Sequence, residues 1–459
     1  MKKLECMTLA TLGLLVAMRV FATPTEQEIS QLGTTLTPLG AEMAGNRDGS
    51  IPPWDGGLCK PPAGYQPKKG ESGGGPWMDP FANEQPILKI TSDNLTQYAD
   101  KLDEGTKELF QRYPASFRVD VYPSHRTACY PQWVYDNTIK NVRNPKLVGG
   151  APGLLNAHAQ IPFPIPKNGY EAMWNQSVRV DVPYVKGDQE TWLVDAAGNV
   201  TLTSINRVEQ SKPYWDNERQ AVPDEQPYWT LISTTVAPAS SAGVKQLRHN
   251  FLDTEHRDPM AWSYVPGQRR VRLSPEFKYD TVSTSSGGVL LFDEISGFDG
   301  KMDKFDFVLK GKREMYIPAN AYKFNGASSE LVNTPNHANP DYLRFELRRV
   351  WVVEAHLKPG ERHVQKTKMF YLDEDSWSVA IYNAFDNTGA IQKVTYYPGF
   401  QEYDKPQYRT APNVLYDLTK RVYTHGARMG AEKSSGFYRV ARYPSTYFSP
   451  GSLAGTGIR

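Results

Sequence analysis

Apolar and polar residues alternate one by one in parts of the second half of the chain. Every second residue of the segment KFDFVLK, residues 304–310, is apolar, and the segment LRFELR, residues 343–348, repeats the pattern. Because successive side chains of a strand point to opposite faces, each segment predicts a strand with one buried and one solvated face. Similar β-type segments, bounded by Gly, Pro, Asn or Asp, recur from about Gln189 onward, which predicts an antiparallel meander over residues 189–411.

The first half of the chain combines helical spacing of apolar residues with irregular tracts. Residues 24–45 and 92–113 have a helical period, the second range as one kinked helix or two short ones, and a short helix is predicted over 167–178. The Gly- and Pro-rich tract 52–80 predicts an irregular arm. The predicted divisions are residues 1–22, a signal segment; 23–188, helices and arm; 189–411, the meander; and 412–459, a C-terminal helix and tail, with 23–459 as one structural unit.

A turn is predicted at Pro359-Gly360, between two of the strand-like segments. A hairpin tip at these two residues places His356 opposite His363. Pro-Gly favours a type II turn, whose twist suits hairpins poorly, so a bulge or a longer loop is the alternative that shifts this register.

The first 22 residues have the pattern of a cleavable secretory signal. Lys2 and Lys3 precede an apolar run from Leu9 to Met18, and Ala22 provides the small residue that signal peptidase requires. We therefore expect cleavage near Ala22 and a mature protein in the bacterial periplasm, soluble or peripheral to the outer membrane. No later stretch of the sequence has the roughly 18 apolar residues that a transmembrane helix needs.

Composition and charge narrow the class of partner. The chain has 26 Tyr and 10 Trp, and aromatic residues favour half-buried strands and amphipathic cavities. The whole chain has a net charge of +2, and cleavage removes three basic residues and one acidic residue, so the mature chain is neutral and no nucleic-acid partner is expected. In an oxidising compartment Cys59 and Cys129 are expected to form a disulfide, with two free buried thiols as the alternative.

Two short motifs resemble functional sites without the context that such sites need. Residues 70–74 match the G-x-S-x-G pattern of esterases, but Ser72 lies in the Gly/Pro tract and not between a strand and a helix, so a linker is favoured. Asn46 and Asp48 resemble the start of a calcium loop, but Asp55 stands where a bidentate Glu is required, so an Asx-type turn is favoured.

Histidines and carboxylates are present without the spacing of a strong site. The pairs His356 with His363 and His249 with His256 lack the tight spacing of zinc ligands, and exposed or core histidines are the favoured interpretation. A general acid and a general base are usually two carboxyl groups whose different environments shift their pKa values apart. The acidic residues, which include Asp373-Glu374-Asp375, show no such pair in the sequence. We therefore expect no enzyme activity, no catalytic residue, no bound metal and no cofactor.

Basic residues cluster in three strand-like segments, at residues 268–272, 310–313 and 344–349. A solvated outer sheet face explains such clusters, because charged residues on edge strands prevent aggregation. The alternative is a basic rim that contacts anionic head groups or an acidic partner. The residues of this predicted rim are Arg269, Arg270, Arg272, Arg344 and Arg348.

Four sequence blocks together resemble one bacterial protein family. They are AEMAGNRDGSIPPWDGG, AWSYVPGQRRVRL, FDFVLKGKREMYIPANAY and RFELRRVWVVEAHLKPGERH followed by FYLDEDSW, and they span residues 41–377 in order. They resemble the domain-of-unknown-function 1329 family, which has no established activity. The resemblance implies an α+β, mainly antiparallel fold: a large unclosed β-barrel with helices on its concave side, similar to the periplasmic carriers of lipoproteins, together with the irregular N-terminal arm.

An open aromatic-lined concavity can bind an acyl chain, because each buried methylene contributes about 0.8 kcal/mol. The candidate wall residues are Trp229, Trp262, Tyr264, Phe305, Phe307, Phe345, Trp351, Tyr371 and Trp377, and the alternative for each is an ordinary core position. The favoured function is a non-enzymatic carrier or chaperone for a lipid-like or lipoprotein cargo, linked to outer-membrane sorting. The alternatives are an accessory subunit that docks to an inner- or outer-membrane transport protein and, with little support, a lipid or glycan hydrolase.

Overall fold

The computed structural model describes residues 23–66, 77–150, 152–219, 221–223, 225–410, 412–429 and 436–455. Two features of the sequence lie outside these residues, namely the predicted signal segment 1–22 and the G-x-S-x-G motif at 70–74. Both stay predictions.

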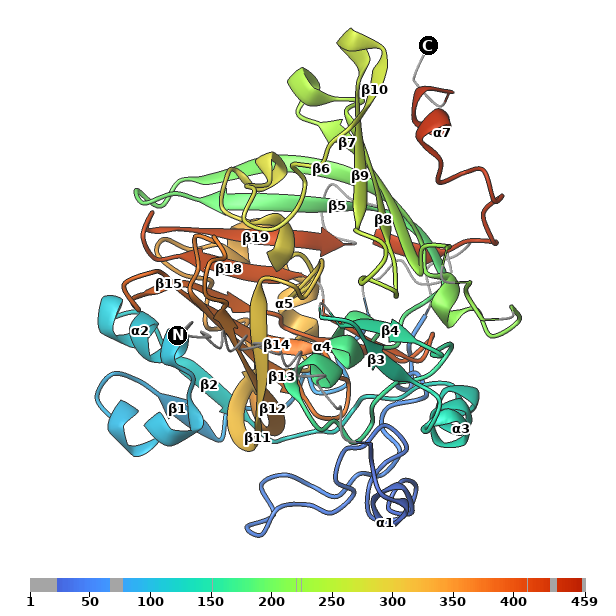
Figure 1. The fold of residues 1–459 in the computed structure, drawn as a ribbon. Coiled ribbons are helices and arrows are strands. Elements are labelled where there is room, and N and C mark those ends of the chain that lie inside the picture. Colours follow the sequence, from blue (N-terminus) through green and yellow to red (C-terminus); the bar gives the residue numbers. More distant parts are fainter. Residues whose placement is uncertain are drawn as a thin grey trace, which may run out of the picture.

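A single 16-stranded sheet dominates the fold (Figure 1). Its strands follow the order β1-β2-β12-β13-β14-β15-β18-β19-β5-β6-β7-β8-β9-β10, with β11 paired to β12 and β20 paired to β5. The strands are β1 Leu88–Ile90, β2 Val119–Tyr122, β5 Tyr184–Val194, β6 Val200–Ser211, β7 Trp229–Ala237, β8 Lys245–Asn250, β9 Met260–Val265, β10 Arg270–Leu273, β11 Phe305–Pro318, β12 Phe345–Leu357, β13 Thr367–Asp373, β14 Val379–Phe385, β15 Ile391–Tyr396, β18 Asn413–Asp417, β19 Val422–Met429 and β20 Gly436–Arg439. Two small sheets pair β3 Lys146–Val148 with β4 Gly153–Leu155 and β16 Phe400–Glu402 with β17 Gln407–Arg409.

The large sheet does not close. Within the described ranges, β1 and β10 are the two ends of the strand order and do not pair with each other. Neighbouring strands pair antiparallel, except that β2 pairs with β12 in parallel. Two meanders, one of β11 to β15 and one of β5 to β10, are connected through β18 and β19, where β19 pairs with β5. The predicted fold class, a large and mainly antiparallel unclosed sheet with a few helices, is confirmed.

The helices are short. They are α1 Glu26–Ile29, α2 Glu104–Arg112, α3 Gln132–Asn141, α4 Gly169–Ser177, α5 Tyr322–Gly326, α6 Ser329–Val332 and α7 Pro450–Gly455. Of these, α2, α4 and α7 lie against strands of the sheet. Helix α4 packs on β11 and β12, with the ring of Tyr170 5.4 Å from that of Phe307. Among the residues described, no helix has the length and apolar character to cross a membrane.

Strand β12 departs from the predicted pattern on its polar face. Phe345 is buried as expected, but Arg348 on the other face is only 1 % exposed. The guanidinium of Arg348 lies 2.8 Å from Asp375 and 3.1 Å from Asp373. The N-terminal arm, which in the structure is the irregular segment 30–66, takes part in this cluster, because residues 42–44 accept or donate further hydrogen bonds there. The prediction of a solvated face is wrong here, because the arm and buried carboxylates cover it.

The helix predicted over residues 24–45 is wrong beyond its first turn. Only α1 is helical there, and a series of turns follows. Gly33 and Gly40 have φ values of +80° and +93°, a left-handed backbone that interrupts a helix. A Cβ on Gly40 would lie 1.7 Å from the carbonyl oxygen of Pro164, so only glycine fits this close approach.

Four other predictions from the sequence have different outcomes. The range 92–113 holds two short 3₁₀ turns followed by α2, and α4 confirms the helix predicted over 167–178. The register predicted at Pro359-Gly360 is wrong, because His356 pairs with Thr367 across a longer loop. Residues 412–459 were expected to form a helix and tail, but they also supply β18, β19 and β20 to the sheet.

The predicted disulfide between Cys59 and Cys129 is confirmed. The two Cα atoms are 5.4 Å apart, and the bond joins positions separated by 70 residues. Cys129 lies just before α3 and is fully buried, so the bond fixes the irregular arm to the body of the protein.

Candidate functional site

A cavity of about 260 Å³ lies over the inner face of strands β5 to β8. The strand registers explain which residues line it, because one cross-strand row runs through all four strands. Leu231 of β7 pairs with Gln210 of β6 and with Arg248 of β8. Gln210 in turn pairs with Val185 of β5. All four side chains of this row line the cavity.

The next row on the same face is also part of the lining. Ser233 of β7 pairs with Val208 of β6 and with Gln246 of β8, and all three residues line the cavity. Because side chains alternate along a strand, Ile232 points the other way and packs with Leu453 of α7. The inner face is thus mixed apolar and polar, while the outer face is covered by the C-terminal segment.

The opposite wall comes from segments that lie far apart in the sequence. One segment is 283–296, which connects β10 to β11, and the other segments belong to the region from β15 to β19. The apolar residues of this wall are Leu290, Phe292, Ile295, Tyr397 and Tyr408, whereas Phe437 of β20 lies beside β5 and extends the inner face. A cavity lined in this way suits a molecule that has both apolar and polar parts.

Charged residues gather at one end of the cavity. Nζ of Lys212 lies 2.5 Å from Oδ2 of Asp181, and Nη2 of Arg248 lies 2.6 Å from Oδ2 of Asp299. Burial raises the pKa of the Asp181 carboxyl, but the charge of Lys212 more than offsets this effect, so the pKa lies below its usual range. Arg179 lines the same end.

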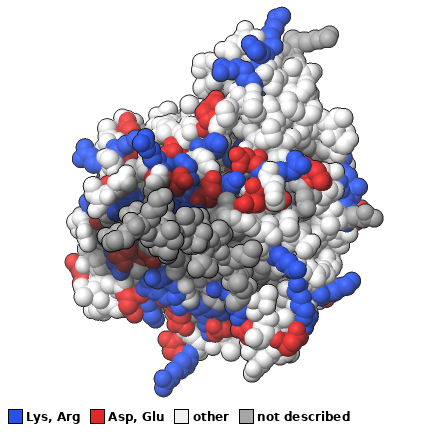
Figure 2. All heavy atoms as spheres, viewed as in Figure 1, with Lys and Arg blue, Asp and Glu red and all other residues white. Residues whose placement is uncertain are grey.

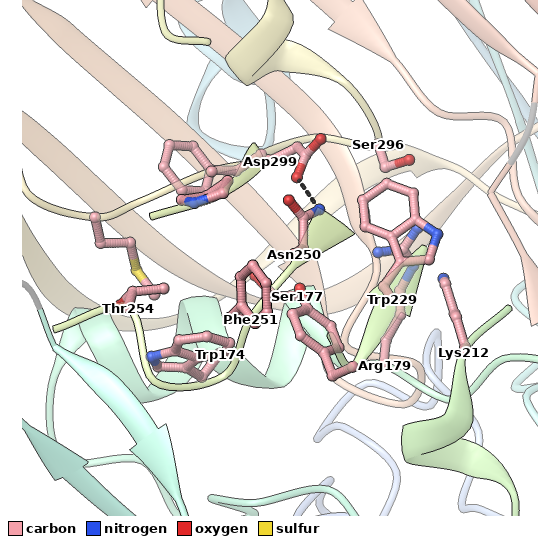
Figure 3. A pocket seen from close by; sticks show the side chains of 15 residues that line it. Trp174, Ser177, Arg179, Lys212, Trp229, Asn250, Phe251, Thr254, Ser296 and Asp299 are labelled. Atoms are coloured by element: carbon pink, nitrogen blue, oxygen red, sulfur yellow. Dashed lines mark hydrogen bonds between the residues drawn. The ribbon is translucent and has the colours of Figure 1, made fainter. Parts of the chain in front are cut away.

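A smaller cavity of about 30 Å³ adjoins the charged end (Figure 3). Four residues line both cavities and stand between them, namely Arg179, Lys212, Trp229 and Ser296. Figure 3 shows Trp229 and Lys212 on one side of this smaller cavity and the hydrogen bond from Asn250 to Asp299, 2.8 Å long, across from them.

The large cavity also borders a groove of about 470 Å³. Val180, Asp181 and Gln407 line both spaces. The groove continues past Trp133 and Arg442, and Arg442 is exposed. A ligand that is longer than the cavity can therefore extend from the cavity into the groove.

The structure separates the nine aromatic residues that were predicted to form a cavity wall. Trp229 lines the cavity. The other eight lie in packed clusters outside its lining: Phe305, Phe307, Trp351 and Trp377 in one, Phe345 and Tyr371 in a second, and Trp262 and Tyr264 in a third next to α7. The reason is that α4 and the N-terminal arm already fill the space over β11 to β14, so aromatic side chains there pack against protein.

The predicted basic rim is also divided. Arg269, Arg270 and Arg272 are exposed at the β9–β10 hairpin, which projects from the body, and basic side chains are visible at that end in Figure 2. Arg344 and Arg348 do not belong to a rim, because they are 7 % and 1 % exposed and form buried ion pairs.

The other candidate residues from the sequence have structural partners. Nε2 of His363 lies 3.0 Å from Asp293, and His256 hydrogen-bonds Asp253, so the predicted histidine pairs are not adjacent. The backbone N–H of Ser50 donates to Asp48, which is the favoured Asx-type turn. No group of three or more His, Cys, Asp or Glu residues that could hold a metal occurs among the residues described here.

The residues at the charged end of the cavity were missed by the sequence analysis. Arg179 directly follows the helix predicted over 167–178, Lys212 lies just after β6, and Arg248 lies within β8. A signal for the cavity was present in β6, where the inward side chains Asn206, Val208 and Gln210 are mostly polar. A buried-core strand face would be apolar, so polar inward residues mark a face that borders a cavity.

Comparison with known proteins gives a match over most of the chain. The family profile described as "Protein of unknown function (DUF1329)" matches residues 89–454. An uncharacterized protein of Pseudomonas aeruginosa is 37 % identical over 452 residues, which cover 97 % of this chain and 96 % of that protein.

Solved structures give weaker similarity. A DUF1329 family protein from Desulfovibrio piger has a TM-score of 0.44 and 12 % identity, covering 62 % of this chain and 97 % of that one. A putative outer membrane lipoprotein-sorting protein domain from Vibrio parahaemolyticus has a TM-score of 0.43 and 13 % identity, covering 62 % of this chain and 98 % of that one.

Proposed function

This chain belongs to the DUF1329 family, whose function is not established, and from its cavity we propose that it is a non-enzymatic periplasmic carrier or chaperone for a lipid-like molecule. The cargo moves between the inner-membrane machinery and the outer membrane. The single observation that supports this role is the cavity of about 260 Å³, with inner rows of mixed polarity on one side and apolar residues on the other.

The size and lining of the cavity favour a compact amphipathic ligand or one part of a larger ligand. Its volume of about 260 Å³ lies just below the roughly 300–1,000 Å³ of small-molecule sites. Each methylene that enters contributes about 0.8 kcal/mol, so even a short apolar segment gains measurable affinity. A longer chain extends into the groove beyond Val180 and Gln407.

The disulfide supports the proposed compartment. Disulfides persist in oxidising environments such as the periplasm and are rare where thiols are kept reduced. The bond between Cys59 and Cys129 therefore agrees with export through the signal segment that the sequence predicts.

Binding of the neutral fluorescent probe N-phenyl-1-naphthylamine tests this proposal. Ser233→Trp places an indole in the cavity, whereas Thr234→Trp, the next residue of β7, places it on the opposite face of the sheet. We expect wild type and Thr234→Trp to bind the probe and Ser233→Trp to bind about tenfold or more weakly, a loss of about 1.4 kcal/mol. If no variant binds, or if Ser233→Trp binds like wild type, the cavity is not the binding site.

A docking role is the second candidate, and the exposed β9–β10 hairpin favours it. Arg270 and Arg272 are exposed on β10, which is an edge strand of the large sheet. Such a basic edge fits an acidic surface of an envelope transporter. Crosslinking in intact cells from this hairpin tests the role: a crosslink to a membrane protein that is lost in the Arg269, Arg270 and Arg272 to Gln triple variant supports it, and a crosslink that persists contradicts it.

A further inference from the structure

Two hydrogen-bond donors at the charged end of the cavity have no acceptor among the residues that the structure describes. They are Nη1 of Arg248 and Nε1 of Trp229, and both atoms are buried. Both residues line the cavity, and Arg248 is only 6 % exposed. An unsatisfied buried donor costs about 1–3 kcal/mol, so such groups usually indicate a missing partner.

A third cation at the same end, Arg179, has no carboxylate partner in the part of the chain that the structure describes. One guanidinium nitrogen of Arg179 donates to the backbone carbonyl of Gln176 at 2.9 Å. Among the described residues, no Asp or Glu oxygen lies within ion-pair distance of Arg179, although Lys212 and Arg248 at the same end each have one. Burial lowers the pKa of Arg179, and the charge of Asp181, which lies beyond ion-pair distance, opposes this effect only in part.

The three groups lie close together. Leu231 pairs with Arg248, and Trp229 lies two residues before Leu231 on the same face of β7, so Trp229 and Arg248 are diagonal neighbours. Arg179 lines both cavities together with Trp229 (Figure 3). The charges of Arg179 and Arg248 both act on the buried hydroxyl of Tyr228, opposing the rise in its pKa that burial causes.

The other polar groups at this end of the cavity leave its net charge positive. Asp181 and Asp299 are paired with Lys212 and Arg248, and Arg409, which also lines the cavity, is paired with Glu402, so the charge of Arg179 is in excess. The amide oxygens of Asn250 and Gln407 have no donor in the described part of the chain. Both are uncharged acceptors that a hydroxyl or a water molecule satisfies, so they do not compete for an anion.

We propose that the ligand carries an anionic head group, a carboxylate or a phosphate, which binds at this end between Arg179, the free Nη1 of Arg248 and the indole N–H of Trp229. This inference rests on the proposed carrier function and adds the chemical class of the cargo. The oxygens of the head group accept hydrogen bonds from all three residues, and its charge balances that of Arg179. The apolar tail then lies along Leu231 and Val208 towards the apolar wall.

The orientation follows from the costs of burial. A charged head group placed at the apolar wall would lose its hydration without gaining partners, whereas at this end it gains charge-assisted hydrogen bonds. Arginine presents a planar fork that matches both carboxylate and phosphate oxygens. The structure therefore specifies the charge of the head group, and the two chemistries are separated by experiment.

Displacement of N-phenyl-1-naphthylamine by matched compounds tests the inference. Dodecanoate, dodecyl phosphate and methyl dodecanoate share an apolar chain and differ in head group. We expect the two anions to displace the probe from wild type at concentrations about tenfold or more below that of the ester. The reason is that the ester cannot form the charge-assisted hydrogen bonds that the anions form. The stronger of the two anions identifies the head-group chemistry.

The variant Arg179→Gln removes the unbalanced charge and keeps an amide donor. We expect it to weaken displacement by the anions about tenfold or more while displacement by the ester stays as in wild type. Arg272→Gln, an exposed arginine on β10, serves as the control and is expected to match wild type. Thermal unfolding of each variant confirms that the fold is retained, and Arg179→Lys, which keeps the charge, is expected to recover part of the preference.

The outcomes separate this inference from the function on which it rests. If wild type binds the probe and all three compounds displace it equally, the anionic head group is wrong and the carrier function stands. If Arg179→Gln keeps the full preference for anions, the assignment of Arg179 is overturned. If neither the probe nor any of the compounds binds, the carrier function itself is contradicted.

Discussion

Lys212 and Asp181 form an ion pair at the charged end of the cavity, with Nζ of Lys212 2.5 Å from Oδ2 of Asp181. Lys212 leads from β6 into a short 3₁₀ turn, and Asp181 precedes β5, so the pair joins the two segments at the start of the second meander. Nζ of Lys212 also lies 5.3 Å above the ring of Trp229, which places the cation against the cavity wall.

Lys212→Met is expected to destabilise the protein by about 1–2 kcal/mol, because it leaves the carboxylate of Asp181 without its closest cation. This cost is below the roughly 3–5 kcal/mol of a fully buried pair, since the Asp181 side chain is 25 % exposed and Arg179 still acts on it. Urea denaturation gives the free energy of unfolding. The double variant Asp181→Asn with Lys212→Met is expected to recover part of the loss, and a purely additive double variant would show that the pair is not coupled.

The disulfide is expected to account for a large share of the stability of the N-terminal arm. Replacing Cys59 and Cys129 together by Ser removes a crosslink between positions 70 residues apart. Chain-entropy reasoning predicts a loss of about 4 kcal/mol for a loop of this length. Equilibrium unfolding of the oxidised protein and of the double variant measures the difference, and an unchanged free energy of unfolding would contradict the prediction.

A buried histidine makes stability depend on pH. His425 of β19 is fully buried, stacks on Phe324 with ring centroids 4.7 Å apart, and hydrogen-bonds Asn333. Burial, with a further effect from Arg428, lowers its pKa well below the usual value, so the folded protein keeps it neutral. The unfolded chain binds a proton below about pH 6.5, so stability is lost as the pH falls through that value, by about 1.4 kcal/mol per pH unit.

His425→Gln removes this contribution. Between pH 7.5 and pH 5 the free energy of unfolding should therefore decrease in both proteins, and the decrease in the variant should be about 2 kcal/mol smaller than in wild type. The matched control is His256→Gln, because the His256 side chain is 75 % exposed. Equal pH dependence in the His425 variant would show that this histidine is protonated in the folded state.

The sequence predicted the sheet because strand periodicity is local. Alternation in residues 304–310 and the β-type segments after Gln189 needed no knowledge of distant contacts, and the structure has strands there. The predicted helix over 24–45 failed because distant contacts decide that region. The backbone of Gly40 fits against Pro164, and Leu39 packs in a core formed by later parts of the chain.

Less of the candidate site than of the sheet could be predicted from the sequence. Aromatic residues such as Phe307 and Trp377 looked like cavity wall, but whether an inward face is filled depends on α4 and the arm. Arg348 looked exposed because its partners, Asp373 and Asp375, lie on another strand and the following turn. Trp229 was predicted, whereas Arg179 and Arg248 were identified only once the registers and the unpaired donors were known.

The most direct test of the carrier function is mass spectrometry of an organic extract of the protein purified from its native envelope under mild conditions. The account predicts a co-purifying amphiphile in near-stoichiometric amount, present in wild type and in Thr234→Trp and depleted in Ser233→Trp, whose indole occupies the cavity. An extract of the wild-type protein without any such molecule, or an equal amount in Ser233→Trp, would contradict it.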